Sequence, residues 1–235
     1  MTIVFFDLDG VLVKECGVAE YGYAYLLNLL ADPVFDLSQA PDPKYFKIAS
    51  ELRPKIKGRH PIAKVEIIYK LLQISAAQIA RFPPVMSVEL WYAAQRTFIV
   101  KNHPVASYIV PGAKELIQRM KSANITLATL TANEAGQAKW LLEYCCVEFD
   151  HIFGYDLERP DLVLKQDLPR QFLRENHFER VFVIGDGVPD VLAGNILGVS
   201  IGIAWGDDNY QKLQENGASL VCRGVEVEKI MTFVE

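Results

Sequence analysis

The chain has 235 residues, of which 51% are hydrophobic and 23% are charged, and its formal net charge is −5. This length suffices for one α/β core with or without a smaller second domain, and the composition excludes a disordered chain. The negative charge disfavours nucleic acid and anionic lipid as partners. No apolar run reaches the length of a membrane-spanning helix, so we expect a cytoplasmic protein with no membrane partner.

Five short apolar segments predict the strands of a parallel sheet. Each is rich in β-branched or aromatic residues and is followed by Gly, Asp, Asn or Thr, which is typical of strands buried on both faces. These segments are Ile3–Phe6, Ile125–Leu130, His151–Phe153, Val181–Ile184 and Ser200–Ala204. Helical patterns alternate with them at Pro111–Lys121, Glu134–Tyr144, Pro169–Asn176, Asp190–Leu197 and Asn209–Asn216. This order predicts an α/β fold with a doubly wound parallel sheet and right-handed crossovers.

The region 14–108 breaks this alternation. Its apolar residues repeat at helical spacing, as in Val88, Leu90, Trp91, Ala94 and Phe98, and prolines separate the helical segments. It contains no convincing strand pattern. We therefore expect an all-helical domain at 14–108, inserted into an α/β core that comprises 1–13 and 109–235.

Two carboxylates, Asp7 and Asp9, directly follow the first predicted strand and precede Gly10. Residues i and i+2 of a strand face the same way, so both are expected at the carboxyl edge of the sheet, where ligands bind in open α/β sheets. Two carboxylates this close repel each other unless a cation lies between them or one holds a proton. The alternative is an acidic turn at the end of a strand.

A second acidic group, Gly185–Asp190, follows the strand predicted at Val181–Ile184. Asp186 is expected to point into the crevice, whereas Asp190 stands at the start of a helix. Carboxylate oxygens, together with water and substrate oxygens, meet the octahedral, all-oxygen preference of Mg²⁺. An ordinary turn with Asp190 as a helix cap is the alternative.

Two further segments carry polar groups that suit a phosphorylated ligand. Thr131-Ala132-Asn133 follows the second predicted strand, where a hydroxyl can bond a phosphoryl oxygen. Lys165 would neutralise part of the charge of several nearby carboxylates. Taken singly, each is equally compatible with an ordinary strand threonine or a solvated lysine.

Taken together in chain order, Asp7-Leu8-Asp9, Thr131, Lys165 and Gly185–Asp190 closely resemble the four motifs of the haloacid dehalogenase superfamily of phosphohydrolases. The resemblance covers the whole chain, and the helical insertion looks like the C1-type cap of that superfamily. It implies a Rossmann-like core, Mg²⁺ as the cofactor and a small phosphorylated metabolite as the substrate. We expect the chain to act as a monomer or a homodimer.

The resemblance also implies a role for each motif. Asp7 would be the nucleophile that forms an aspartyl-phosphate, and Asp9 the general acid that protonates the leaving oxygen and then the base that activates water. Thr131 would hold a phosphoryl oxygen, with Ala132 and Asn133 beside it in the substrate site. Lys165 would pair with Asp7 and steady the charge of the transferred group.

The metal ligands follow from the same resemblance. The family holds Mg²⁺ with the first Asp carboxylate, a backbone carbonyl and an Asp of the fourth motif, which here are Asp7, the carbonyl of Asp9 and Asp186. Asp190 would support this set. A carboxylate that attacks a phosphate dianion requires such neutralisation by the cation and Lys165.

The chain departs from the family pattern at two places. Arg159-Pro160-Asp161 is closer in its letters to the usual third motif, but Lys165 is preferred because the extended Leu162-Val163-Leu164 leads into it and Pro169 can begin the next helix. Lys14-Glu15 stands where many members have Asp-Ser or Asp-Thr, which leaves the subfamily open.

The leading hypothesis is therefore a Mg²⁺-dependent phosphatase. The alternatives are a phosphomutase of the β-phosphoglucomutase type and a catalytically inactive binding protein on the same fold. Dehalogenation is disfavoured, because dehalogenases of this fold lack the second Asp, here Asp9. Arg59 and His60 are candidates for touching the substrate from the cap, and a basic loop before a helix is the alternative.

Overall fold

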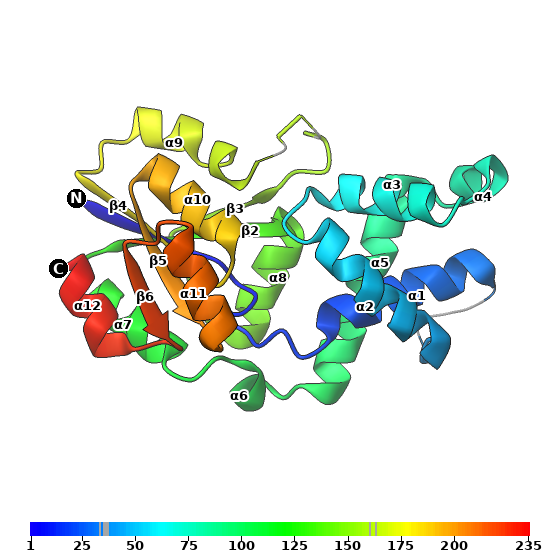
Figure 1. The fold of residues 1–235 in the computed structure, drawn as a ribbon, viewed down its shortest axis with the longest axis horizontal. Coiled ribbons are helices and arrows are strands. Elements are labelled where there is room, and N and C mark those ends of the chain that lie inside the picture. Colours follow the sequence, from blue (N-terminus) through cyan, green and yellow to red (C-terminus); the bar gives the residue numbers. More distant parts are fainter. Residues whose placement is uncertain (33, 35–37, 160, 163) are drawn as a thin grey trace. The chain divides into compact units, whose positions relative to one another are not determined.

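The computed structural model describes residues 1–32, 34, 38–159, 161–162 and 164–235 (Figure 1). Its internal contacts divide the chain into an α/β unit, made of Met1–Lys14, Val105–Asp156 and Asp161–Glu235, and a helical unit, made of Glu15–Pro104 and a short segment that begins at Leu157. The main segment of the helical unit is Glu15–Pro104, where the sequence led us to expect a helical domain at 14–108. The segment at Leu157 was not predicted, because it carries no helical pattern of its own.

The α/β unit contains a six-stranded parallel sheet in the order β3-β2-β1-β4-β5-β6. Its strands are β1 (Thr2–Phe6), β2 (Thr126–Glu134), β3 (His151–Tyr155), β4 (Arg180–Gly185), β5 (Val199–Ala204) and β6 (Leu220–Arg223). The fold class is as predicted, but β6 was missed because it has four residues and ends in Cys and Arg. The strand order reverses between β1 and β4, which places a crevice at their carboxyl ends.

Helices cover both faces of this sheet. The helices of this unit are α6 (Val105–Tyr108), α7 (Ala113–Ser122), α8 (Ala135–Cys145), α9 (Arg170–Glu175), α10 (Val188–Leu197), α11 (Asp207–Glu215) and α12 (Val227–Val234), with a 3-10 turn, η1, at Lys165–Asp167. Figure 1 shows α9 and α10 on one side of the sheet and α7 and α12 on the other. Ile3 and Phe5 of β1 pack with Ala193 of α10 in the core of the first side. The helix α12 was not predicted.

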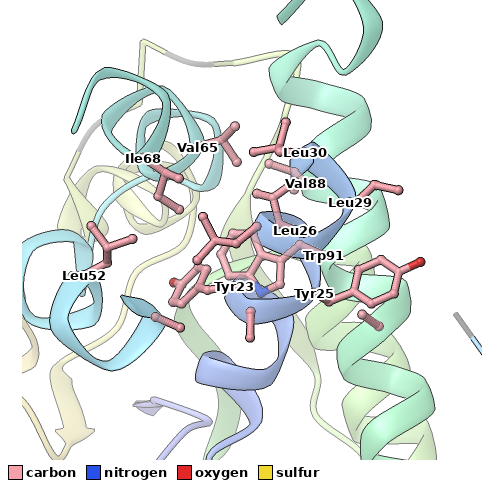
Figure 2. Close-up of a cluster of buried hydrophobic side chains, with 14 of the residues drawn as sticks. Tyr23, Tyr25, Leu26, Leu29, Leu30, Leu52, Val65, Ile68, Val88 and Trp91 are labelled. Carbon is pink, nitrogen blue, oxygen red and sulfur yellow. The ribbon is translucent and has the colours of Figure 1, made fainter. Parts of the chain in front are cut away.

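The helical unit consists of α1 (Val18–Ala31), α2 (Pro43–Ile56), α3 (Pro61–Leu71), α4 (Ala76–Arg81) and α5 (Pro84–Asn102). Proline occupies the first turn of α2, α3 and α5, where its missing N–H has no intrahelical partner to lose. Figure 2 shows how Leu26, Val88 and Trp91 converge in the core of this unit. None of the helices in the described part of the chain is long and apolar enough to cross a membrane.

Candidate active site

The first acidic motif lies in a tight turn after β1. The Asp7 N–H donates to the carbonyl of Ile184 at 2.8 Å, and the Val13 N–H donates back to the carbonyl of Leu8 at 3.0 Å. Gly10, in this turn, has φ of 78°, a left-handed conformation that suits glycine. The prediction that strand alternation orients the two carboxylates is therefore wrong, because β1 ends at Phe6 and the turn sets the direction of Asp9.

Lys165 forms the centre of a buried ion-pair cluster. Its Nζ lies 2.9 Å from Asp7 Oδ1 and 2.5 Å from Asp190 Oδ1, and the Lys165 side chain is 5% exposed. Asp190 lies in the first turn of α10, where its Oδ2 accepts a hydrogen bond from the Gly187 N–H at 3.0 Å. The Asp190 carboxylate thus both caps its helix and holds Lys165 beside Asp7.

The electrostatics of this cluster disfavour ionisation of Asp7. Burial is the main cause that raises the pKa of Asp7 to about 8, and the charges of Asp190, Asp186 and Asp9 add to it, whereas Lys165 opposes it. Burial alone would lower the pKa of Lys165, but Asp190 and Asp7 outweigh it and raise that pKa. One buried lysine faces several carboxylates, so the site is short of positive charge.

Three carboxylates of this cluster suit a divalent cation. Oxygen atoms of Asp7, Asp186 and Asp190 lie within 4.8 Å of one another. Hard, oxygen-only donors of this kind, with excess negative charge, fit Mg²⁺. Gly10 lets the Asp186 carboxylate lie close to the turn after β1, because a Cβ at position 10 would be 2.4 Å from Asp186 Oδ2. The Asp9 carboxylate is not a member of this group, so its predicted part as a ligand depends on its backbone carbonyl.

The Asp9 side chain instead meets the end of β2. Asn133 Nδ2 donates to Asp9 Oδ2 at 2.9 Å, and the Asn133 N–H donates to Thr131 Oγ1 at 3.2 Å. Thr131 is buried, and Ala132 and Asn133 are partly buried. The sequence predicted that this strand ends at Leu130, but β2 continues to Glu134 with a shift of register after Leu130. Asn133 was predicted to contact substrate, and in the structure its amide contacts the predicted acid.

The remaining predicted residues belong to the helical unit. His60 is 2% exposed, and its Nδ1 accepts a hydrogen bond from the Ile62 N–H at 3.2 Å as the N-cap of α3. Arg59 is exposed, and Arg159 lies in the segment that begins at Leu157. Of the two candidates for the third-motif cation, it is Lys165 that contacts Asp7. Pro160 and Val163, which the two third-motif alternatives include, lie outside the described residues.

Two residues that the sequence reasoning did not single out reach this site. Trp205, which follows β5, donates its Nε1–H to the carbonyl of Gly10 at 2.7 Å, and Asn209 Nδ2 donates to the carbonyl of Asp186 at 3.1 Å. Both lie at the carboxyl edge of the sheet, so the rule that pointed to Asp7 could have found them. They were overlooked because neither is a usual catalytic residue type.

Comparisons with known proteins agree with this architecture. Residues 1–198 match the model of a family described as haloacid dehalogenase-like hydrolase. A hydrolase of the haloacid dehalogenase-like family from Streptococcus pneumoniae is similar in structure with a TM-score of 0.67 at 19% identity, over 100% of this chain and 99% of that one. A predicted phosphatase from Clostridium acetobutylicum has a TM-score of 0.66 at 22% identity, over 98% of each chain.

A third solved structure carries a different name. A β-phosphoglucomutase from Clostridium difficile has a TM-score of 0.64 at 20% identity, over 99% of this chain and 96% of that one. No curated protein matches the chain. At these identities the structural likeness shows the fold, so the chemistry has to be argued from the residues of the site.

Proposed function

We propose, since the chain belongs to the haloacid dehalogenase-like hydrolase family, that it is a Mg²⁺-dependent phosphatase of a small phosphorylated metabolite. The observation that carries this proposal is the contact of Lys165 with Asp7, beside the carboxylates of Asp186 and Asp190. A nucleophilic carboxylate next to a buried cation and a divalent-metal donor set suits phosphoryl transfer.

The metal would be held by Asp7 and Asp186, with support from Asp190 and a contribution from the backbone carbonyl of Asp9. Bound Mg²⁺ supplies positive charge that favours the ionised form of Asp7 at neutral pH and offsets the charge of the phosphoryl group. This agrees with the raised pKa of Asp7 in the protein alone, which marks a site that lacks one positive charge.

The reaction would proceed in two displacements at phosphorus. In the first, an Asp7 oxygen forms a bond to phosphorus while the bond to the leaving oxygen breaks, and Asp9 gives that oxygen a proton. In the second, Asp9 takes a proton from water as the water oxygen attacks phosphorus, and the bond to Asp7 breaks. The products are the free alcohol and inorganic phosphate, and both aspartates return to their starting states.

Neighbouring residues would prepare these steps. Lys165 and the Leu8 N–H both contact Asp7 Oδ1, at 2.9 Å and 2.8 Å, which fixes the orientation of the nucleophile. The Asn133 amide holds one oxygen of Asp9. Thr131 is proposed to bind a phosphoryl oxygen at the end of β2, with Ala132 beside it.

A phosphomutase is the second candidate. The likeness to a β-phosphoglucomutase over 99% of this chain favours it, although the identity is 20%. A mutase would share the first displacement and would return the phosphoryl group to a sugar hydroxyl rather than to water. The residues Arg59 and His60, proposed to touch the substrate, belong to the helical unit, in which the acceptor would be selected.

The test is phosphate release from a panel of phosphorylated metabolites by the wild type, Asp7→Asn and Asp208→Asn. Asp208 is exposed in the first turn of α11, so its variant is a control for the same chemical change. We expect Asp7→Asn to lower turnover about 10³-fold or more, Asp208→Asn to leave it unchanged, and EDTA to abolish it. Equal rates for the wild type and Asp7→Asn would overturn the proposal. Formation of an isomer from a hexose 1-phosphate without phosphate release would favour the mutase.

A further inference from the structure

The loop after β5 joins the two acidic loops of the site through a closed ring of contacts. Trp205 donates its Nε1–H to the carbonyl of Gly10 at 2.7 Å. The Trp205 N–H donates to Asn209 Oδ1 at 3.2 Å, and Asn209 Nδ2 donates to the carbonyl of Asp186 at 3.1 Å. Asp186 completes the ring, because its carboxylate lies against Gly10 so closely that a Cβ there would be 2.4 Å away.

Trp205 makes a specific hydrogen bond although much of the residue is exposed to solvent. Trp205 is 52% exposed, so burial of apolar surface holds only part of its ring. Its ring lies near Gly224, where an added Cβ would be 3.4 Å from Cζ3. The hydrogen bond to the carbonyl of Gly10, in the first acidic turn, fixes the direction of the indole N–H.

The side-chain amide of Asn209 makes two hydrogen bonds, one to Trp205 and one to the backbone of Asp186. Its acceptor oxygen binds the Trp205 N–H just before α11, which an ordinary helix-start residue would also do. Its donor nitrogen binds the backbone of Asp186, in the loop after β4, which helix capping does not require. The second contact transmits the position of α11 to a carboxylate of the candidate metal group.

Neither residue offers a metal ligand of the kind that Mg²⁺ prefers, since the indole has only a donor and both amide atoms of Asn209 are engaged. What the ring fixes is the separation of two backbone segments, one that carries Asp7 and Asp9 and one that carries Asp186. Their carboxylates repel each other, and a loop free to relax would move them apart. A fixed separation lets a cation bind without first drawing the loops together.

We infer that Trp205 and Asn209 are positioning residues that hold the Asp7–Gly10 turn and the Asp186 loop at the spacing that a divalent cation requires. The inference rests on the proposed function in that it takes the acidic cluster as a Mg²⁺ site. It extends that function to the loop after β5, which supplies no catalytic group. Loss of either residue weakens cation binding before any chemistry takes place.

The experiment is a calorimetric titration of metal-free protein with MgCl₂, without substrate, together with thermal unfolding in EDTA. Trp205→Phe keeps an aromatic ring and removes the N–H, and Asn209→Ala removes both contacts of the amide. Trp140→Phe in α8 and Gln211→Ala on the exposed face of α11 are the matched controls. We expect the Kd for Mg²⁺ to rise about three- to tenfold in Trp205→Phe, as for loss of one hydrogen bond, and at least as much in Asn209→Ala, and to stay unchanged in the controls.

The double variant sharpens the test. Because both residues belong to one ring, the combined loss of Mg²⁺ affinity is expected to be smaller than the product of the single losses. An unchanged Kd in Trp205→Phe would overturn the inference, and so would a lower Tm in EDTA with no change of Kd, which would mark a purely structural role. Wild-type protein that binds Mg²⁺ but hydrolyses no phosphate ester would overturn the proposed function and leave this inference standing.

Discussion

The buried polar groups around Tyr69 in the helical unit and around Lys165 in the α/β unit are arranged in different ways. In the helical unit, the Tyr69 hydroxyl donates to the carbonyl of Phe82 at 2.6 Å and lies 2.5 Å from Ser87 Oγ, so neutral groups satisfy one another. In the α/β unit, Lys165 and Asp190 are buried beside Asp7, and like charges stay together although they raise the pKa of Asp7. The first arrangement stabilises a core, whereas the second is costly for folding, a cost that the proposed metal would offset.

We therefore expect substitutions in the two units to have different effects. Substitutions in the helical core should act on the free energy of unfolding. Substitutions in the acidic cluster should act on catalysis and metal binding, and some should even stabilise the protein. The predictions below test that division, beginning with the largest expected effect.

Trp91→Ala is expected to lower the free energy of unfolding by about 3–5 kcal/mol, since it leaves a large cavity in the helical core. Trp91 is 2% exposed, and its ring centroid lies 4.7 Å from that of Tyr23. Urea unfolding followed by circular dichroism measures the loss. Val100→Ala on the same helix is the control, because Val100 is 60% exposed, and its cost should stay below about 0.5 kcal/mol. Similar costs for both variants would contradict a packed helical core.

Lys165→Met is expected to lower turnover about 10²- to 10³-fold, because it removes the positive charge that contacts Asp7, the proposed nucleophile. Arg159→Met is the matched control and also the test of the alternative third motif, and it should leave turnover unchanged. Phosphate release under saturating Mg²⁺ measures both. Loss of activity in Arg159→Met, with activity kept in Lys165→Met, would reverse the assignment of the cation.

Much of the fold could be predicted, because the α/β unit follows simple periodic rules. Apolar runs predicted five strands, and their order predicted the doubly wound sheet. The sixth strand, Leu220–Arg223, was missed because an edge strand of four residues has little apolar pattern. The helical unit was predicted as a class, since its apolar residues repeat at helical spacing, as Val88 and Trp91 of its core illustrate.

The candidate site could be predicted in its residue types but less well in its contacts. Asp7, Asp9 and Asp186 were predicted as site residues because each follows a predicted strand, and parallel strands bring their carboxyl ends to one edge of the sheet. The hydrogen bond from Asn133 to Asp9 depends on a register shift in β2, and the contact of Trp205 with Gly10 depends on a left-handed turn. Such irregular backbone leaves no periodic signal in a sequence.

Asp7→Asn should stabilise the metal-free protein at neutral and alkaline pH, in contrast to its effect on turnover. The pKa of Asp7 is raised from 3.8 to about 8, so the folded state holds this proton more tightly than the unfolded chain does. Stability from this group is therefore complete below about pH 4 and is lost as the pH rises to about 8. The variant avoids that loss and is expected to be more stable by roughly 1–3 kcal/mol at pH 8.

Thermal unfolding in EDTA from pH 4 to pH 9 measures this effect, with Asp208→Asn as the control. The difference in Tm between Asp7→Asn and the wild type should be near zero at pH 4 and should grow with pH. A variant less stable than the wild type at pH 8 would mean that the ion pair with Lys165 outweighs burial and the neighbouring acids. The acidic cluster would then stabilise the fold, and its contrast with the helical core would disappear.

The smallest effects are expected at two helix starts, one in each unit. Ser75 Oγ accepts a hydrogen bond from the Gln78 N–H at the start of α4, and the Glu134 carboxylate accepts from the Gly136 and Gln137 N–H groups at the start of α8. Ser75→Ala and Glu134→Ala should each cost about 1 kcal/mol of unfolding free energy, the usual loss for an N-cap. The two variants are therefore matched in their expected loss of unfolding free energy.

Turnover should separate them. Glu134 directly follows Asn133, whose amide holds Asp9, so a looser start of α8 alters the end of β2 and with it the position of the proposed acid. We expect a several-fold lower kcat in Glu134→Ala with little change in KM, and no change of either constant in Ser75→Ala. Equal kinetics in the two variants would show that the end of β2 holds Asp9 without help from the cap of α8, because the same loss of folding free energy would then have no catalytic consequence in either unit.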